Sequence, residues 1–168
     1  FTTDPIAPTV TTQAVSSITS TTATGNGNVT DLGFPHATEH GACWSTSENP
    51  TTSASCTTEG AVSTTGAFTS SITGLSPGTT YYVRAYATND AGTVYGDQVS
   101  FTSTPIAPTV TTQAVSSIGT TTATGNGNIT NLGGPNPTQH GVCWSTSENP
   151  TTSNDCTTNG TASSTGAF

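Results

Sequence analysis

The sequence contains no lysine and no methionine, and its only strongly basic residue is Arg84. Nine acidic residues against this single arginine give a formal net charge of −8 and a pI near 4.2. Because Lys and Arg supply most of the attraction to phosphate backbones and anionic lipids, nucleic acid and anionic membrane surfaces are excluded as expected partners. No apolar run approaches the roughly 20 residues that a membrane helix needs, so no membrane insertion is expected.

Charge of either sign is scarce, since only 6% of residues are charged, and hydrophobic residues make up 30%. Disordered chains usually combine low hydrophobicity with high charge and few aromatics, whereas Trp, Tyr, Phe, Val and Ile recur here in spaced groups. No stretch combines helical periodicity with capping residues. Together with the abundance of Thr, which favours strands, these features predict an all-β protein with a thin core.

The sequence repeats itself with a period of about 100 residues. PIAPTVTTQAVSSI at 5–18 recurs unchanged at 105–118, and CWSTSENPTTS at 43–53 recurs unchanged at 143–153. Close identity between neighbouring units is typical of arrays in which each unit contacts only its neighbours. The repeat therefore predicts a polymeric protein built from an array of similar units.

The repeat also predicts the domain boundaries. Residues 1–4 match the tail of a preceding unit, 5–104 form a complete unit, and 105–168 form an incomplete second unit that lacks a counterpart of 69–103. Two explanations stay open. The chain is a window cut from a longer array, or another chain supplies the missing last strands, as in donor-strand complexes.

Short runs rich in Thr, Val and Tyr, broken by Gly, Pro and Asn about every 8–12 residues, predict a β-sandwich or barrel. The expected strands lie near 9–15, 20–30, 38–46, 65–73, 79–88 and 93–102, with a weak one near 50–58.

The clearest expected strand is TTYYVRAYAT at 79–88. Its successive side chains alternate between two faces. The face expected to join the core carries Tyr81, Val83, Ala85 and Ala87. The other face carries Tyr82, Arg84 and Tyr86 and is the predicted contact surface, between chains or beneath sugar, because a large aromatic strip is seldom left bare.

LSPGTTYYVRAYATNDAG at 75–92 resembles the fibronectin type III signature. The matching positions are Leu75, Pro77, Gly78, Thr79, Tyr81, Val83, Ala87, Asn89 and Gly92. The resemblance implies tandem immunoglobulin-like, fibronectin type III-like β-sandwich repeats, and it makes Tyr81 a corner tyrosine whose hydroxyl bonds to nearby backbone. The whole unit is similar to tandem repeats of bacterial surface and secreted proteins, which implies spacer, adhesin or fibre roles rather than catalysis.

Each unit carries two cysteines at the same spacing, Cys43 with Cys56 and Cys143 with Cys156. They do not form the C-x-x-C pattern of redox dithiols, and no basic neighbour is present to stabilise a thiolate. An even number of cysteines at a fixed spacing, in a composition typical of secreted proteins, predicts one disulfide per unit. Free thiols and a metal site are the alternatives.

A zinc site can be written for the first unit with His36, His40, Cys43 and Cys56 as four ligands. The second unit has Asn136 in place of the first histidine, so this set is not repeated. His40 and His140 are expected to be solvated or hydrogen bonded. No nucleophile–base–acid set is visible, so the chain is predicted not to be an enzyme and to have no cofactor.

Trp44 and Trp144 lie beside the first cysteine of each pair and are expected to anchor the core, with sugar stacking as the alternative.

Sequons at Asn28, Asn128 and Asn159 are candidate glycosylation sites, and the many Ser and Thr residues offer O-linked sites. A calcium ion at a repeat junction, held by Asp4 or Asp97, is a weaker possibility than glycosylation. Asp4 is replaced by Thr104 in the next junction, so such a site would not be repeated.

These features favour a structural protein that self-associates into an extracellular bacterial filament or cell-surface stalk. An adhesin or carbohydrate-binding surface repeat is the first alternative. A spacer module of a larger secreted enzyme is the second.

Overall fold

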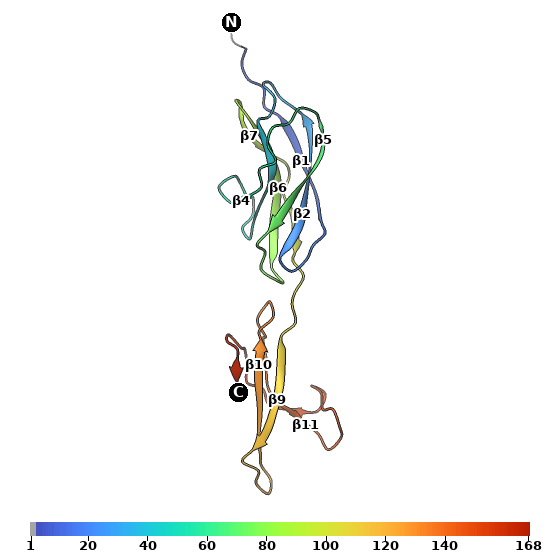
Figure 1. Ribbon diagram of the computed structural model, residues 1–168, viewed down its shortest axis with the longest axis vertical. Coiled ribbons are helices and arrows are strands. Elements are labelled where there is room, and N and C mark those ends of the chain that lie inside the picture. The colour runs from blue at the N-terminus through green and yellow to red at the C-terminus, as the bar shows by residue number, and fades with distance from the viewer. Residues whose placement is uncertain (1–2) are drawn as a thin grey trace. The chain divides into compact units, whose positions relative to one another are not determined.

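The computed structural model describes residues 3–168 and divides into two compact units. We call the part up to Thr104 unit 1 and Pro105–Phe168 unit 2. The described residues form antiparallel strands and no helix (Figure 1). Accordingly, no helix among residues 3–168 is long and apolar enough to cross a membrane.

Unit 1 consists of two antiparallel sheets. One has the order β1-β2-β5, and the other has the order β4-β3-β6-β7, with β8 also paired to β6. The strands are β1 (Thr9–Ser16), β2 (Thr22–Asp31), β3 (Glu39–Ser45), β4 (Ser55–Cys56), β5 (Gly66–Thr73), β6 (Thr80–Asn89), β7 (Gly92–Tyr95) and β8 (Val99–Thr102).

The prediction of a single strand at 93–102 is wrong, because this stretch forms two strands that pair with different halves of β6. β7 pairs with the end of β6 and β8 with its beginning. Gly96 lies between them, and a Cβ at this position would be 2.4 Å from the backbone nitrogen of Thr12 in β1. The chain therefore breaks its strand where another backbone approaches too closely for any side chain. The weak strand expected near 50–58 shrinks to the two residues of β4.

The core of unit 1 lies between the sheets and contains few large side chains. The first cluster comprises Ala23, Ala42, Ile72, Leu75, Tyr81, Val83 and Phe101. The second comprises Val10, Val29, Ala37, Ala85 and Ala87. The predicted core face of β6 is confirmed, because all four of its expected residues are buried. Because alanine side chains bury little apolar surface, the few larger residues such as Ile72 contribute much of the hydrophobic stabilisation.

Tyr81 closes the turn that precedes its own strand. Its hydroxyl oxygen accepts a hydrogen bond from the backbone N–H of Ser76 at 3.0 Å, while its ring stacks with Phe101 at a centroid distance of 5.9 Å. This is the contact that the corner tyrosine was expected to make.

Replacing Tyr81 with Phe is expected to lower the free energy of unfolding of unit 1 by about 1–2 kcal/mol, because the Ser76 N–H is left without its acceptor. Urea denaturation followed by tryptophan fluorescence measures the change. Tyr82→Phe, on the opposite face of the same strand, is the matched control and is expected to change stability by less than about 0.5 kcal/mol. Equal effects of the two variants would contradict this role of the Tyr81 hydroxyl.

Unit 2 repeats the first strands of unit 1, and the counterparts of β2, β3 and β5 are shorter. Its strands are β9 (Thr109–Ser116), β10 (Thr124–Asn131), β11 (Cys143–Trp144), β12 (Asp155–Cys156) and β13 (Gly166–Ala167). β9 pairs with β10 in the register of β1 with β2, so that Thr111 faces Asn128 as Thr11 faces Asn28. β11 has two residues where β3 has seven, because β3 pairs along its whole length with β6 and the sequence of unit 2 has no counterpart of β6.

Candidate functional site

The feature that the two units share most closely is a disulfide between directly paired strand residues. The sulfur atoms of Cys43 and Cys56 are 2.12 Å apart, and those of Cys143 and Cys156 are 2.08 Å apart. Cys43 faces Cys56 in the β3–β4 pair, and Cys143 faces Cys156 in the β11–β12 pair. Since no cysteine is left free, the thiolate ligands of the zinc alternative do not exist in this structure.

The segment after Cys56 lies against β3. Thr57 donates its N–H to the carbonyl of Ala42 at 2.9 Å, and its hydroxyl accepts the N–H of Ala42 at 3.1 Å. A Cβ on Gly41 would be only 2.3 Å from the carbonyl oxygen of Thr57, so glycine is required for this close contact. The disulfide and the Thr57 contacts together hold the segment over one face of the β3–β6 pair.

Tyr86 corrects the predicted contact surface. It is 1% exposed, and its hydroxyl contacts the carbonyl of Thr57 at 2.8 Å and the carboxylate of Glu39. Its ring does lie on the outer face of β6, as alternation requires, but the segment that carries Thr57 covers that face. Tyr86 is therefore a buried packing residue and not a docking residue.

The other two residues of that surface also make contacts within unit 1. Arg84 is half-buried, donates from Nε to the carbonyl of Gly96 at 2.9 Å, and places its guanidinium over the ring of Tyr95 at 4.8 Å from the centroid. Tyr82 is half-buried as well. Of the predicted contact surface, Tyr86 is therefore buried, while Tyr82 and Arg84 keep part of their surface exposed.

Burial, together with the hydrogen bond and negative charge of Glu39, raises the pKa of Tyr86 from 10.0 to about 12. The neutral phenol is favoured in the folded chain, while the unfolded chain ionises near its ordinary value. The contribution of Tyr86 to stability is therefore complete below about pH 10 and is lost as the pH rises from about 10 to about 12.

Spectrophotometric titration of the folded protein is expected to show one tyrosine that ionises near pH 12. Tyr86→Phe is expected to remove this component. Glu39→Gln is expected to lower the pKa while leaving it above 10, because burial, the larger cause, remains. A late component that survives in Tyr86→Phe would show that another tyrosine is responsible.

Both histidines near the cysteines make the same two contacts. Nδ1 of His40 is 2.8 Å from the carbonyl of Gly60, and Nδ1 of His140 is 2.9 Å from the carbonyl of Gly160. His40 also meets the ring of Phe68 edge to face, at a centroid distance of 4.6 Å. His140 meets Phe168 in the same way at 4.7 Å. In each unit, therefore, the histidine links two segments of the fold.

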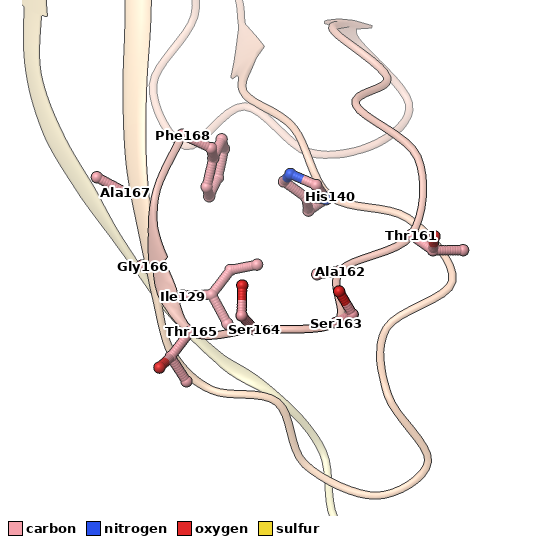
Figure 2. A pocket seen from close by; sticks show the side chains of 10 residues that line it. All are labelled: Ile129, His140, Thr161, Ala162, Ser163, Ser164, Thr165, Gly166, Ala167 and Phe168. Atoms are coloured by element: carbon pink, nitrogen blue, oxygen red, sulfur yellow. The ribbon is translucent and has the colours of Figure 1, made fainter.

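A hollow of about 200 Å³ lies in unit 2, and Figure 2 shows the rings of His140 and Phe168 side by side on its wall. Ile129, Ser164 and the neighbouring Ser and Thr residues supply the rest of the lining. The lining therefore combines hydroxyl groups with the imidazole of His140, whose Nδ1 contacts the carbonyl of Gly160, and it contains no carboxylate or thiol. Throughout residues 3–168, no group of three or more His, Cys, Asp or Glu side chains could hold a metal ion.

A larger hollow of about 700 Å³ lies in unit 1 beside the disulfide. Its lining combines aromatic rings with hydroxyls, contributed by Trp44, Ser45, Thr46, Ser53, Ala54, Ser55, Thr73, Gly74 and Tyr81. Trp44 is half-buried and packs against the first core cluster, so it both anchors the core and forms one wall of the hollow. None of these residues carries a charge, and the lining suits a polar, uncharged ligand. Sequence reasoning found Trp44 but not this concavity, which depends on how the 53–55 and 73–74 segments fold beside it.

The sequon asparagines occupy two kinds of position. Asn28 lies in β2 and Asn128 in β10, each half-buried in the middle strand of three. Asn159 is exposed and lies outside the strands. The calcium candidates Asp4 and Asp97 are both exposed and belong to no ligand cluster among the described residues.

The chain matches no protein-family model, and no curated protein matches it. Similar solved structures include three of the sensor domain of the anti-sigma factor RsgI4 in Pseudobacteroides cellulosolvens. A short form is 20% identical and a long form 19%, each with a TM-score of 0.42, and a solution structure is 18% identical with a TM-score of 0.44. Each match covers 58% of this chain and, in the same order, 94%, 90% and 76% of the other. At these TM-scores the likeness carries no conclusion about the fold or the function of this chain.

Proposed function

We propose that this chain is a structural repeat protein of an extracellular bacterial filament or surface stalk, made of fibronectin type III-like sandwich units that self-associate. The observation that supports this proposal is the recurrence of one disulfide-closed unit. The same cysteine pairing, the same histidine contacts and the same first strand pair occur in both units. Recurrence of closely similar units is typical of proteins whose role is extension.

The disulfides support the proposed location. Structural disulfides persist in oxidising compartments and are rare in reducing cytosol, so the two bridges fit a secreted or extracellular domain. The net charge of −8 fits the same setting, since net charge keeps a repetitive protein soluble before assembly. The proposal includes no enzymatic activity and no cofactor.

Electron microscopy of the native material tests the proposal. Regular fibres are expected, with an axial period of about 35–40 Å for each unit, because a ten-residue strand such as β6 spans about 33 Å and a short junction follows it. The purified protein at low concentration is the control and should be monomeric by light scattering. Discrete particles in the native material would contradict the filament.

A carbohydrate-binding surface repeat is the second candidate, and the hollow beside Trp44 supports it. An aromatic wall with several hydroxyls is suited to stack against a sugar ring and bond its hydroxyl groups. A glycan array probed with the chain is expected to show saturable binding that is lost in Trp44→Ala and retained in Tyr82→Phe. Failure of every glycan to bind would remove this candidate.

Attached glycans remain part of the proposal for the filament. Among the three sequons, exposed Asn159 is the most accessible to modification after folding. Intact-mass measurement before and after enzymatic deglycosylation tests attachment at the asparagines, and peptide mapping locates it.

A further inference from the structure

Three asparagines of the chain are each followed directly by a glycine, at 26–27, 126–127 and 159–160. Such a pair can modify itself, because glycine has no Cβ to keep its backbone nitrogen away from the asparagine side chain. The nitrogen attacks Cγ of the asparagine, ammonia leaves, and a cyclic imide forms. Water then opens the ring to aspartate, or to isoaspartate, in which the backbone runs through the side-chain carbon. All three pairs share this chemistry, so the fold decides which of them reacts.

Two of the pairs are held within strands. Asn26 lies in β2 and Asn126 in β10, and each of these is the middle strand of a three-stranded sheet. The side-chain nitrogen of Asn26 donates to the carbonyl of Ala14 at 2.7 Å and to Oγ of Ser16 at 3.0 Å. Asn126 makes the equivalent bonds at 2.8 Å and 3.0 Å. Because the ring can close only after these bonds and the strand pairing open, the fold protects both pairs.

The third pair lies outside the strands, and Asn159 is exposed. Within residues 3–168, no backbone carbonyl accepts a hydrogen bond from the N–H of Gly160. The attack requires this nitrogen to lose its proton, and here that loss breaks no backbone hydrogen bond. A Cβ built on Gly160 would have no other segment of the chain within 4 Å, so the space around the pair is open to water.

Unit 1, which contains both complete sheets, exposes the matching segment in the same way. Glu59 stands where unit 2 has Asn159 and is also exposed. Gly60 has a φ of +85° and Gly160 a φ of +79°, and a Cβ on Gly60 would likewise have nothing within 4 Å. The strands β6, β7 and β8 of unit 1 leave this segment uncovered, so its exposure is a property of the fold.

We propose that the 159–160 pair is a site of spontaneous modification, at which the folded chain converts Asn159 to aspartate and isoaspartate. The Gly160 nitrogen forms a bond to Cγ and loses its proton, and the side-chain nitrogen leaves as ammonia. One water molecule then adds to the ring, breaks one of its two carbon–nitrogen bonds and leaves a carboxylate. Position 159 thereby gains the negative charge that Glu59 carries in unit 1. The reaction needs only the folded chain and water, and it does not depend on the proposed filament.

The isoaspartate product changes the contacts with His140. Asn159 donates its N–H to the carbonyl of His140 at 2.9 Å, and the carbonyl of Gly160 accepts the N–H of His140 at 3.1 Å. Isoaspartate adds one carbon to the backbone between these two groups, so the two bonds cannot both keep their geometry. Both products also lack the amide nitrogen to which an N-linked glycan attaches. Modification and glycosylation therefore compete for the side chain of Asn159.

Incubation of the purified, unglycosylated full chain in heavy-oxygen water at slightly alkaline pH, followed by peptide mapping, tests the proposal. Asn159 is expected to become aspartate and isoaspartate that carry the heavy oxygen, at least about tenfold faster than Asn26 reacts. The label shows that water opened the ring during the incubation. In urea with the disulfides reduced, all three pairs are expected to react at similar rates, because the fold no longer protects two of them.

Two variants separate this chemistry from removal of a glycan. Asn159→Gln is expected to leave this peptide unlabelled, because the longer side chain closes its ring far more slowly. Thr161→Ala removes the sequon but keeps the pair, and it is expected to react at the unsubstituted rate. In the folded chain, labelling of Asn159 no faster than that of Asn26 would overturn the proposal. Loss of labelling in Thr161→Ala would also overturn it, because the product would then come from an attached glycan.

Discussion

Replacing Cys43 and Cys56 together with alanine is expected to lower the free energy of unfolding of unit 1 by about 3 kcal/mol. The bridge joins residues 13 positions apart and restricts the unfolded chain, and the alanines remove this restriction. Alanine suits the site, because Cys43 is completely buried and a polar replacement would be left without partners. Urea denaturation followed by Trp44 fluorescence in a Trp144→Phe background measures the effect.

The second unit supplies the matched control for this change. Cys143→Ala with Cys156→Ala removes an equivalent bridge and is expected to leave the unfolding transition reported by Trp44 unchanged, because the bridge lies in the other compact unit. Peptide mapping under non-reducing conditions checks the premise directly. Recovery of Cys43 and Cys56 as free thiols, or an unchanged transition in the first variant, would show that the bridge does not stabilise unit 1.

Ile72→Ala is expected to lower the free energy of unfolding of unit 1 by about 3–4 kcal/mol. Ile72 is fully buried, and its neighbours include Ala23 and Ala42. A Cβ on Gly25 would be 3.2 Å from the Ile72 side chain, so the isoleucine packs directly on the β2 backbone. Such small neighbours cannot move in to fill the space, and the cavity remains largely open.

Chemical denaturation measures this effect against Ile6→Ala. Ile6 is 63% exposed, and its replacement is expected to cost less than about 1 kcal/mol. A loss below about 1 kcal/mol for Ile72→Ala would show that this core tolerates truncation and that other contacts hold the sheets together.

The strands could be predicted from the sequence where one physical rule decides them. Alternation along 79–88 identified the buried face of β6, because a two-residue period leaves a strand only two choices of face. The comparison of two copies favoured disulfides over zinc, because Asn136 breaks the four-ligand set. Both inferences use local information that is present in the residue order.

Two of the errors, the single strand at 93–102 and the exposed Tyr86, have a common cause, which is contact between segments far apart in the chain. The break at Gly96 follows from the approach of Thr12, and the burial of Tyr86 follows from the segment that carries Thr57. The hollow beside Trp44 escaped prediction for the same reason. Residue order shows which face of a strand points outward, but not which segment later covers that face.

The placement of the two ends of unit 1 has a consequence for a chain under tension. Ile6 lies beside one end of β6 and Thr102 beside the other, so a pulling force acts along the strands and loads their hydrogen bonds in shear. Such bonds must break together rather than one after another, which raises the force that the unit withstands. If the unit unfolds under force, the Cys43–Cys56 disulfide prevents the residues between the two cysteines from extending. This loop would otherwise add about 40 Å to the extended chain, so the disulfide limits the length of the unfolded unit.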